Sequence, residues 1–324
     1  MNQKELIPYY DDILSLYQQG VTLRKIGKKY GSGHATIKGI LIKNGDFIEN
    51  REVLSVKIPE CEHQNIINCY NNGDEVEEIA EAYNVGHVLI RRILKNYGIH
   101  VMMNKPSKYK VNKHYFDKID NQDKAYILGL LYADGYNIPS KNLVGIELQE
   151  EDSYIIEKIR DNMESDFPIR FRELKSKNPN WKNHKIFNII NHRLSVVLNN
   201  LGVFPNKSLI LEFPTFLPDN MMPHFLRGYF DGDGHIPKKK YSRDAQFIST
   251  RNFCEAAQKY LKDLLDINSV VTLNIKDPNS PRYNGITCTW RIKDKESSKK
   301  FYNYIYKDAN MYLERKYKVY TSKF

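Results

Sequence analysis

The sequence has few cysteines and no long apolar run, and each shortage excludes a class of protein. Its four cysteines form no CxxC pair, which argues against a zinc site and against a disulfide framework. No stretch reaches the roughly 18–20 apolar residues of a membrane span, and the first residues have no apolar signal region. We therefore expect a cytoplasmic protein with reduced thiols. The cysteines are Cys61, Cys69, Cys254 and Cys288.

Positive charge exceeds negative charge by 10, and the excess lies in one part of the chain. Residues 1–105 hold 13 basic and 13 acidic residues, so the whole excess falls in residues 106–324. A basic domain favours a polyanionic partner, and nucleic acid is the commonest one. A solvated lysine-rich surface without such a partner would show the same charge.

An internal repeat with an offset of 53 occupies the first hundred residues. The matched pairs include Tyr17 with Tyr70, Gly20 with Gly73, Ile26 with Ile79, Gly33 with Gly86 and Gly45 with Gly98. Apolar spacing and glycine turns predict three short helices in each unit, with Thr22 as an N-cap in the first. Helix, glycine turn and helix form the helix-turn-helix pattern, whose last helix enters a major groove. A structural three-helix bundle or a protein-docking module would show the same pattern.

Basic residues on the last helix of each unit are candidate DNA contacts. They are Lys38 in unit 1 (residues 1–50) and Arg91, Arg92 and Lys95 in unit 2 (residues 51–100). The preceding helix of unit 2 is acidic, so its face is not expected to contact phosphate. Residues 101–114 form a basic linker with Lys108 and Lys110, either a strap along a phosphate backbone or a solvated tether. The units resemble helix-turn-helix domains of resolvases and transposases in pattern only.

Two segments, residues 127–135 and 226–234, share an unusual pattern. Each is an apolar, helix-like run with a glycine in its middle, Gly129 or Gly228, and each ends in small-Asp-Gly. Glycine inside a helix costs about 1 kcal/mol against alanine, so matched glycines indicate that the two helices pack closely together. Glycine is also common just after the end of a helix, and Gly135 and Gly234 are expected to end these two helices.

The last acid of each segment, Asp134 or Asp233, would then lie beside the other at two negative helix ends. Such a pair needs a proton or a cation, and Mg²⁺ with oxygen ligands meets that need. Two such sites are what a two-metal phosphodiester hydrolase requires. Alternatively, each Asp only forms the turn at a helix end.

The two segments resemble the motifs of the LAGLIDADG homing endonucleases in their single-chain form. This resemblance implies that Asp134 and Asp233 bind metal, together with the carbonyls of Ala133 and Gly232. The first motif departs from the family name at Tyr132, where an earlier Asp would stand. Residues 198–208 and 304–317 are similar to the linker and the terminal helix of the family, so the resemblance covers about residues 115–324.

The resemblance implies an α+β fold after an all-α tandem helix-turn-helix region. Two pseudo-symmetric αββαββα halves, residues 115–205 and 206–324, would form a DNA-binding saddle. Alternating stretches at 143–149, 185–190 and 287–292, with a shorter one at 246–249, predict strands whose polar face would lie in a major groove.

Basic residues near the expected hairpin tips are further candidate DNA contacts, or else an ordinary soluble loop surface. They are Arg170, Arg172, Lys175, Lys238, Lys239, Lys240, Arg243, Lys276 and Arg282. The family also places a basic residue on a strand near the scissile phosphate. By position this is Arg291 in the second half and Asn188, with Lys185 nearby, in the first.

These observations predict a monomeric, site-specific double-strand DNA endonuclease with a long asymmetric target. Its catalytic residues would be Asp134, Asp233, Arg291 and Lys185, with two or three Mg²⁺ (or Mn²⁺) ions shared between the two acids in the DNA complex. Double-stranded DNA is the expected partner, with no membrane, in the cytoplasm of a bacterial or phage-infected cell and in the context of intron homing. A non-cleaving transcription regulator of the same fold, or an RNA-binding intron maturase, remains the alternative.

Overall fold

The computed structural model describes residues 2–19, 21–47, 58–102, 108–174, 178–237, 244–274 and 286–323. Within these ranges no helix combines the length and the apolar character that a membrane crossing requires. The predicted DNA contacts Lys175, Lys238, Lys239, Lys240, Arg243, Lys276 and Arg282 lie outside the described residues.

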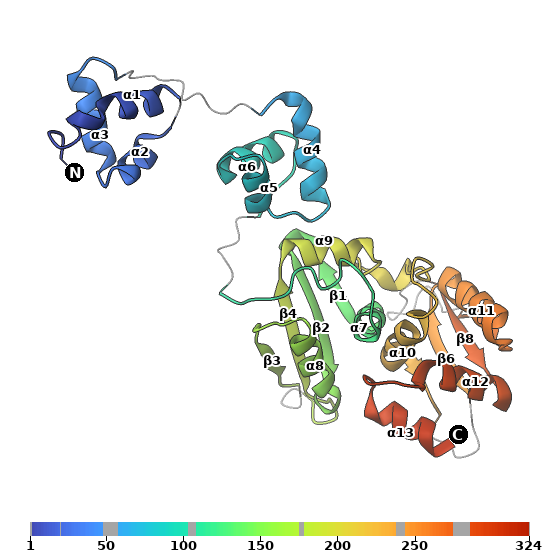
Figure 1. Cartoon of the computed structure of the whole chain (residues 1–324). Coiled ribbons are helices and arrows are strands. Elements are labelled where there is room, and N and C mark those ends of the chain that lie inside the picture. The colour runs from blue at the N-terminus through green and yellow to red at the C-terminus, as the bar shows by residue number, and fades with distance from the viewer. Residues whose placement is uncertain are drawn as a thin grey trace.

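Each N-terminal repeat unit folds as three helices around its own small apolar core, as the repeat predicts (Figure 1). The helices are α1 (Tyr10–Gln18), α2 (Leu23–Lys29), α3 (His34–Lys43), α4 (Glu60–Asn71), α5 (Val76–Ala82) and α6 (His87–Asn96). The Thr22 side chain accepts a hydrogen bond from the Lys25 amide and caps α2. Gly45 and Gly98, which match in the repeat, have φ of +79° and +78° after α3 and α6. Such positive φ angles suit glycine and end both helices in the same way.

Residues 122–306 contain two halves with the same order of elements. The first comprises α7 (Gln122–Ala133), β1 (Gly135–Ile138), β2 (Leu143–Gln149), α8 (Tyr154–Asn162), β3 (Ile169–Arg172), β4 (His184–Ile190) and α9 (His192–Asn200). The second comprises α10 (Met222–Asp233), β5 (Gly234–His235), β6 (Ala245–Ser249), α11 (Arg251–Leu265), β7 (Val270–Asn274), β8 (Thr287–Ile292) and α12 (Lys295–Tyr306). Helix α13 (Glu314–Lys323) follows.

Both four-stranded sheets are antiparallel and have the same strand order, β1-β2-β4-β3 and β5-β6-β8-β7. This α+β architecture, αββαββα twice over, agrees with the prediction. Strands β2 and β8 have the predicted bounds, and β4 and β6 begin one residue earlier than predicted. The alternation pattern missed β1, β3, β5 and β7. The first three have four, four and two residues and are too short to show a period, and the sequence of β7 does not alternate.

A single apolar core runs through both halves, with α7 and α10 side by side at its centre (Figure 1). Strand β8 shows how each sheet joins this core. Alternate side chains are buried, and Trp290 stacks on Phe247 of β6 with ring centroids 4.6 Å apart. Helix α11 packs against this sheet, as α8 and α9 pack against the other. The residues between the buried ones, such as Thr289 and Arg291, belong to the opposite face.

Candidate functional site

The first helices of the two halves, α7 and α10, make the most extensive contact of any two described elements. A Cβ at Gly129 would overlap the Phe225 carbonyl oxygen and lie 2.8 Å from the Tyr229 amide nitrogen. A Cβ at Gly228 would overlap the Tyr126 carbonyl oxygen in the same way. The two helix backbones therefore touch, and the predicted role of the paired glycines is confirmed.

The two helix ends lie together and carry the two acids. Asn121 caps the start of α7, and Asp134 is the residue after its last turn. On the other helix Asp233 is the last residue. A Cβ at Gly232 would lie 2.8 Å from a carboxylate oxygen of Asp134, which is too close for a real Cβ atom. The end of α10 therefore packs directly against the acid that follows α7.

Proline and glycine define the two ends of the motif helices. Helix α10 begins at Met222, with Pro223 in its first turn, where proline fits. Gly234 is extended, with φ of −76°, and neither it nor Gly135 has a positive φ. Instead, a Cβ at Gly135 would lie 2.6 Å from the Leu131 carbonyl oxygen. These glycines are needed because the chain folds back tightly into a strand, and not because of a left-handed turn.

The surroundings of the acid pair favour the protonated form of both carboxyls. Both residues are exposed, but the protein around their carboxyls displaces much of the water. This desolvation, together with the negative charge of Asp134, raises the pKa of Asp233 to about 6. Desolvation also raises the pKa of Asp134, although the charges of Lys316 and Lys207 oppose the shift. A cation placed between these carboxylates would remove the same penalty.

The raised pKa of Asp233 predicts a pH-dependent stability in the absence of divalent metal. A carboxyl that holds its proton longer when folded destabilises the protein as pH rises from the unfolded pKa, near 4, to about 6. We expect Asp233→Asn to remove this decline. The variant should match wild type near pH 4 and exceed it at pH 7 by on the order of 1 kcal/mol, a shift reduced by solvent screening. Unfolding midpoints in EDTA at the two pH values measure this, and equal midpoints at pH 7 would contradict it.

Two buried lysines bind the ends of the motif helices, and the prediction missed both. The Nζ of Lys316 donates to the carbonyls of Phe230 at 2.6 Å and Gly234 at 2.5 Å, and lies 3.4 Å from that of Gly232. The Nζ of Lys207 donates to the carbonyl of Gly135 and lies 3.4 Å from that of Ala133.

Only 5% of Lys316 and 8% of Lys207 is exposed. Burial lowers the pKa of Lys316 to about 8, against the attraction of the nearby acids, and lowers that of Lys207 as well. Each motif helix thus has one ammonium group on its negative end, beside the acid. The sequence held a signal for this pair, because each segment that resembled a family linker or terminal helix contains one of these lysines.

The positions of Tyr132 and Asp231, where the motifs differ, have related structural roles. Asp231 is fully buried and accepts hydrogen bonds from the Leu313 amide at 2.7 Å and from two tyrosine hydroxyls. The Tyr132 hydroxyl donates to the Leu201 carbonyl. Each side chain fastens its helix to the segment that leads to the lysine at the end of that helix, Lys207 or Lys316. The difference between the motifs therefore lies outside the acid pair.

The two basic catalytic candidates, Arg291 and Lys185, lie on different faces of their sheets. In the sheet registers Phe187 corresponds to Trp290, so Asn188 corresponds to Arg291, as predicted. Arg291 forms an ion pair with Asp244. Lys185 is not brought to the acid pair. It lies three residues before Asn188 in β4, so its side chain belongs to the opposite face of the sheet. Its Nζ instead donates to Glu157 of α8 at 3.1 Å.

The described DNA-contact candidates differ in their exposure and in whether they form ion pairs within the protein. Lys38, Arg92, Lys95, Lys108, Lys110 and Arg170 are exposed. Arg172 is exposed but pairs with Glu147 at 3.0 Å, and Arg91 is half-buried and pairs with Glu77 at 2.9 Å. Lys38 lies over the ring of Phe47 at 4.8 Å from its centroid.

Metal binding at the acid pair would need ligands beyond side chains. Among the described residues, no group of three or more His, Cys, Asp or Glu side chains could hold an ion. The donors at hand are the two carboxylates and the carbonyls of the helix ends, which are hard oxygen ligands of the kind Mg²⁺ prefers. Water and phosphate oxygens of a bound substrate would complete such a shell. The residues present therefore fit a magnesium ion.

Two αββαββα halves that meet through glycine-packed, acid-ended helices define the class of an α+β protein with LAGLIDADG architecture. Residues 221–306 match the family model described as a LAGLIDADG-like domain. Residues 221–306 are therefore similar to a LAGLIDADG-like domain.

Among known sequences, an uncharacterized protein of Methanocaldococcus jannaschii is 28% identical over 261 residues, which are 78% of this chain and 93% of that protein. Among solved structures, full-length DUF199/WhiA from Thermatoga maritima is similar with a TM-score of 0.39 and 17% identity. That match covers 66% of this chain and 65% of the WhiA chain, less than two thirds of its length. The homing endonuclease I-WcaI bound to its DNA recognition sequence gives a TM-score of 0.46 and 16% identity, over 69% of this chain and 97% of that chain.

Proposed function

We propose that the chain is a site-specific double-strand DNA endonuclease of the single-chain, two-motif LAGLIDADG form, with residues 115–205 as the first motif half. One observation carries this proposal. Asp134 and Asp233 end two helices whose backbones touch, and the charge of Asp134 contributes to the raised pKa of Asp233. A fold that needed only turn formers at these places would have no reason to keep two acids side by side, where their charges repel each other.

The residues of the chain would share the work as follows. The polar faces of the two sheets would bind the duplex, and each acid would serve one strand. Asp134 and Asp233, with the carbonyls of Ala133 and Gly232, would hold Mg²⁺, which when bound supplies charge stabilisation and an acidified water. The ammonium groups of Lys207 and Lys316 would keep the helix ends and their acids in place. Arg291 would face one scissile phosphate after leaving Asp244, while Asn188 stands at the matching place in the first half.

Cleavage of DNA by wild type and single-acid variants tests the proposal. A plasmid with the intron-less insertion site of the gene would be incubated with Mg²⁺ or EDTA. We expect linear product only with Mg²⁺, and a loss of double-strand cutting of at least about 10³-fold in Asp134→Asn and in Asp233→Asn. Nicking of one strand by either variant would support one acid per strand. Asp263→Asn, an exposed acid on α11, is the control and should cut as wild type does.

Metal binding can be followed without the target. A ligand that binds only the folded state raises the unfolding midpoint by mass action. Mg²⁺ should therefore stabilise wild type and Asp263→Asn more than either acid variant. An equal response in all four proteins would remove the acid pair as the metal site.

A second function is favoured by the inequality of the two halves. Asn188 replaces a basic residue in the first half, and Arg291 is bound to Asp244 in the second. A DNA-binding regulator that does not cut would need no free basic side chain at either position. Tight binding of the insertion site by wild type, without Mg²⁺-dependent cutting, would select this function. Binding of the intron RNA in its place would select a maturase.

The N-terminal units would extend the DNA contact as helix-turn-helix modules. Their third helices present exposed cations, Lys38 on α3 and Arg92 and Lys95 on α6. Phosphate contacts of this kind steepen the dependence of affinity on salt by about one unit of log–log slope for each contact.

A further inference from the structure

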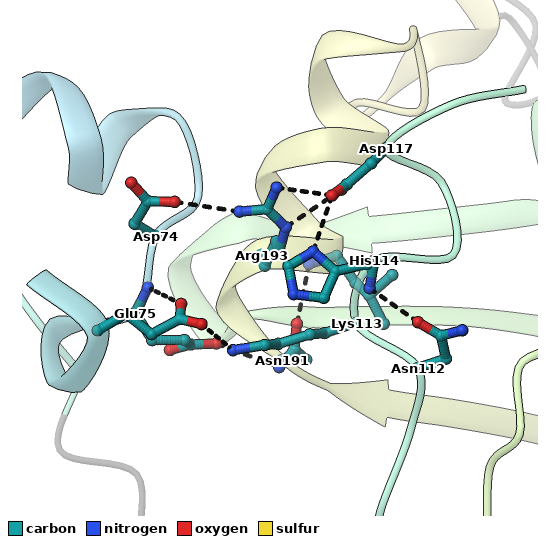
Figure 2. Close-up of polar contacts among 10 residues, drawn as sticks. Asp74, Glu75, Asn112, Lys113, His114, Asp117, Asn191 and Arg193 are labelled. Atoms are coloured by element: carbon teal, nitrogen blue, oxygen red, sulfur yellow. Dashed lines mark hydrogen bonds and ion pairs between the residues drawn. The ribbon is translucent and has the colours of Figure 1, made fainter.

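Helical unit 2 (residues 58–101) is joined to the first LAGLIDADG half by an arginine at the start of α9. The guanidinium of Arg193 donates to Asp74 of unit 2 at 3.1 Å and to Asp117 of the first half at 2.7 Å (Figure 2). Only 17% of this side chain is exposed. A charged group bridging two acids in so enclosed a place fixes both partners more firmly than a surface ion pair does.

Backbone and ring packing surround this bridge. The ring of His192 is buried and stacks on Tyr70, with centroids 4.2 Å apart and planes 18° apart. Its Nε2 lies 2.9 Å from the carbonyl oxygen of Tyr70. Gly73 has φ of +99°, and a Cβ there would lie 3.3 Å from the Cα of Arg193. Unit 2 therefore meets α9 by close packing as well as by charge.

Part of the acidic face of unit 2, including Glu75 and Glu78, lies at this joint. Asn191, the N-cap of α9, donates to Glu75 at 3.1 Å (Figure 2). Lys113 donates to Glu78 at 2.5 Å. These acids approach the positive end of the α9 dipole, where negative charge is favourable. Asp74 and Glu78 are thus paired with cations from outside unit 2, and Glu75 with the amide of Asn191.

Basic residues from both sides of the joint face one hollow. A cavity of about 740 Å³ lies between unit 2 and the first sheet. Arg91 of α6, Lys108 and Arg170 of β3 are among its lining residues, together with the acids Glu75 and Glu77 of unit 2. Cations of α6 and of the first sheet therefore line the same cavity.

We infer that unit 2 is a docked, specificity-determining part of the DNA-binding surface, which reads base pairs at a fixed distance from the acid pair. This inference rests on the proposed DNA-binding function. The joint holds α6 in register with the first sheet, so α6 and the saddle contact one continuous site instead of two sites joined by a variable spacer.

Two measurements test the joint and DNA reading separately. In the free protein, pulsed EPR would measure the distance between nitroxides on the exposed Cys61 of α4 and on Asp161→Cys of α8, with Cys69→Ser to prevent extra labelling. In the complex, hydroxyl-radical footprinting would map the protected DNA. Asp74→Arg and Arg193→Gln break the bridge from its two sides. Glu81→Arg, an exposed acid on the same helix as Glu78, gives the same charge change as Asp74→Arg.

We expect one narrow distance distribution in wild type and Glu81→Arg, and a broad one in both joint variants. The joint variants should also lose protection at one end of the footprint. They should bind a full-length site about tenfold more weakly, because unit 2 must then be ordered when DNA binds. A broad distribution in wild type, or an unchanged footprint in both joint variants, would overturn the inference. A narrow wild-type distribution without any DNA binding would overturn the proposed function and leave the docking itself standing.

Discussion

Gly228→Ala is expected to destabilise the two-half domain by about 3 kcal/mol, and Gly129→Ala by a similar amount. A methyl group at either position would overlap a carbonyl oxygen of the facing helix, and a backbone cannot turn away as a flexible side chain can. The helices would have to separate along the centre of the core that both halves share. Urea unfolding followed by tryptophan fluorescence measures the change, since Trp290 lies in this core.

Gly39→Ala on α3 is the matched control for these substitutions. A Cβ there meets the end of the Gln3 side chain, which can move aside. Because alanine favours a helix interior over glycine, this variant should be neutral or stabilised by up to about 1 kcal/mol. If Gly228→Ala unfolded at the same urea concentration as wild type, the close helix contact would not be what orders the acid pair.

Lys316→Met is expected to cost about 3 kcal/mol of folding free energy, the second large effect. The methionine side chain fills the space, but the carbonyls at the end of α10 lose their buried donor. Loss of the ammonium charge would also raise the pKa of Asp233 further, since Lys316 lowers it. Lys207→Met should show the same behaviour in the first half, with a smaller cost because fewer carbonyls are involved.

Lys318→Met gives the comparison on the same helix. Lys318 is exposed and pairs with Glu314 one turn away, so its loss should cost less than about 0.5 kcal/mol. Chemical denaturation gives both stabilities, and NMR titration of the aspartate carboxyls gives the pKa. A Lys316→Met protein as stable as Lys318→Met, with Asp233 titrating as in wild type, would show that the lysine does not support the site.

The repeated parts of the molecule were the most predictable. A pattern that occurs twice is unlikely to arise by chance. The paired glycines therefore indicated the helix contact, and this contact indicated where Asp134 and Asp233 meet. The repeat of 53 residues gave the three-helix units in the same way, down to Gly45 and Gly98. Strands with several alternating residues were found within one residue of their bounds.

Features that depend on pairing with a distant segment were not predictable. Lys185 and Arg291 are both basic strand residues, and only the sheet register shows that they belong to different faces. The clamping role of Lys207 and Lys316 depends on carbonyls about 70 to 85 positions away in the chain. A lysine in a linker and a lysine in a terminal helix look like solvated charges until the fold encloses them.

The sequence by itself determined the two motif helices, the glycines through which they touch and the acids at their ends, because these features need only helical spacing and residue size. The tertiary structure alone decided what surrounds those acids: the desolvation that raises the pKa of Asp233, the lysines that bind the helix ends, and the docking of unit 2 on α9. These depend on which surfaces fold against one another, and burial converts ordinary surface charges into fixed, strongly interacting groups.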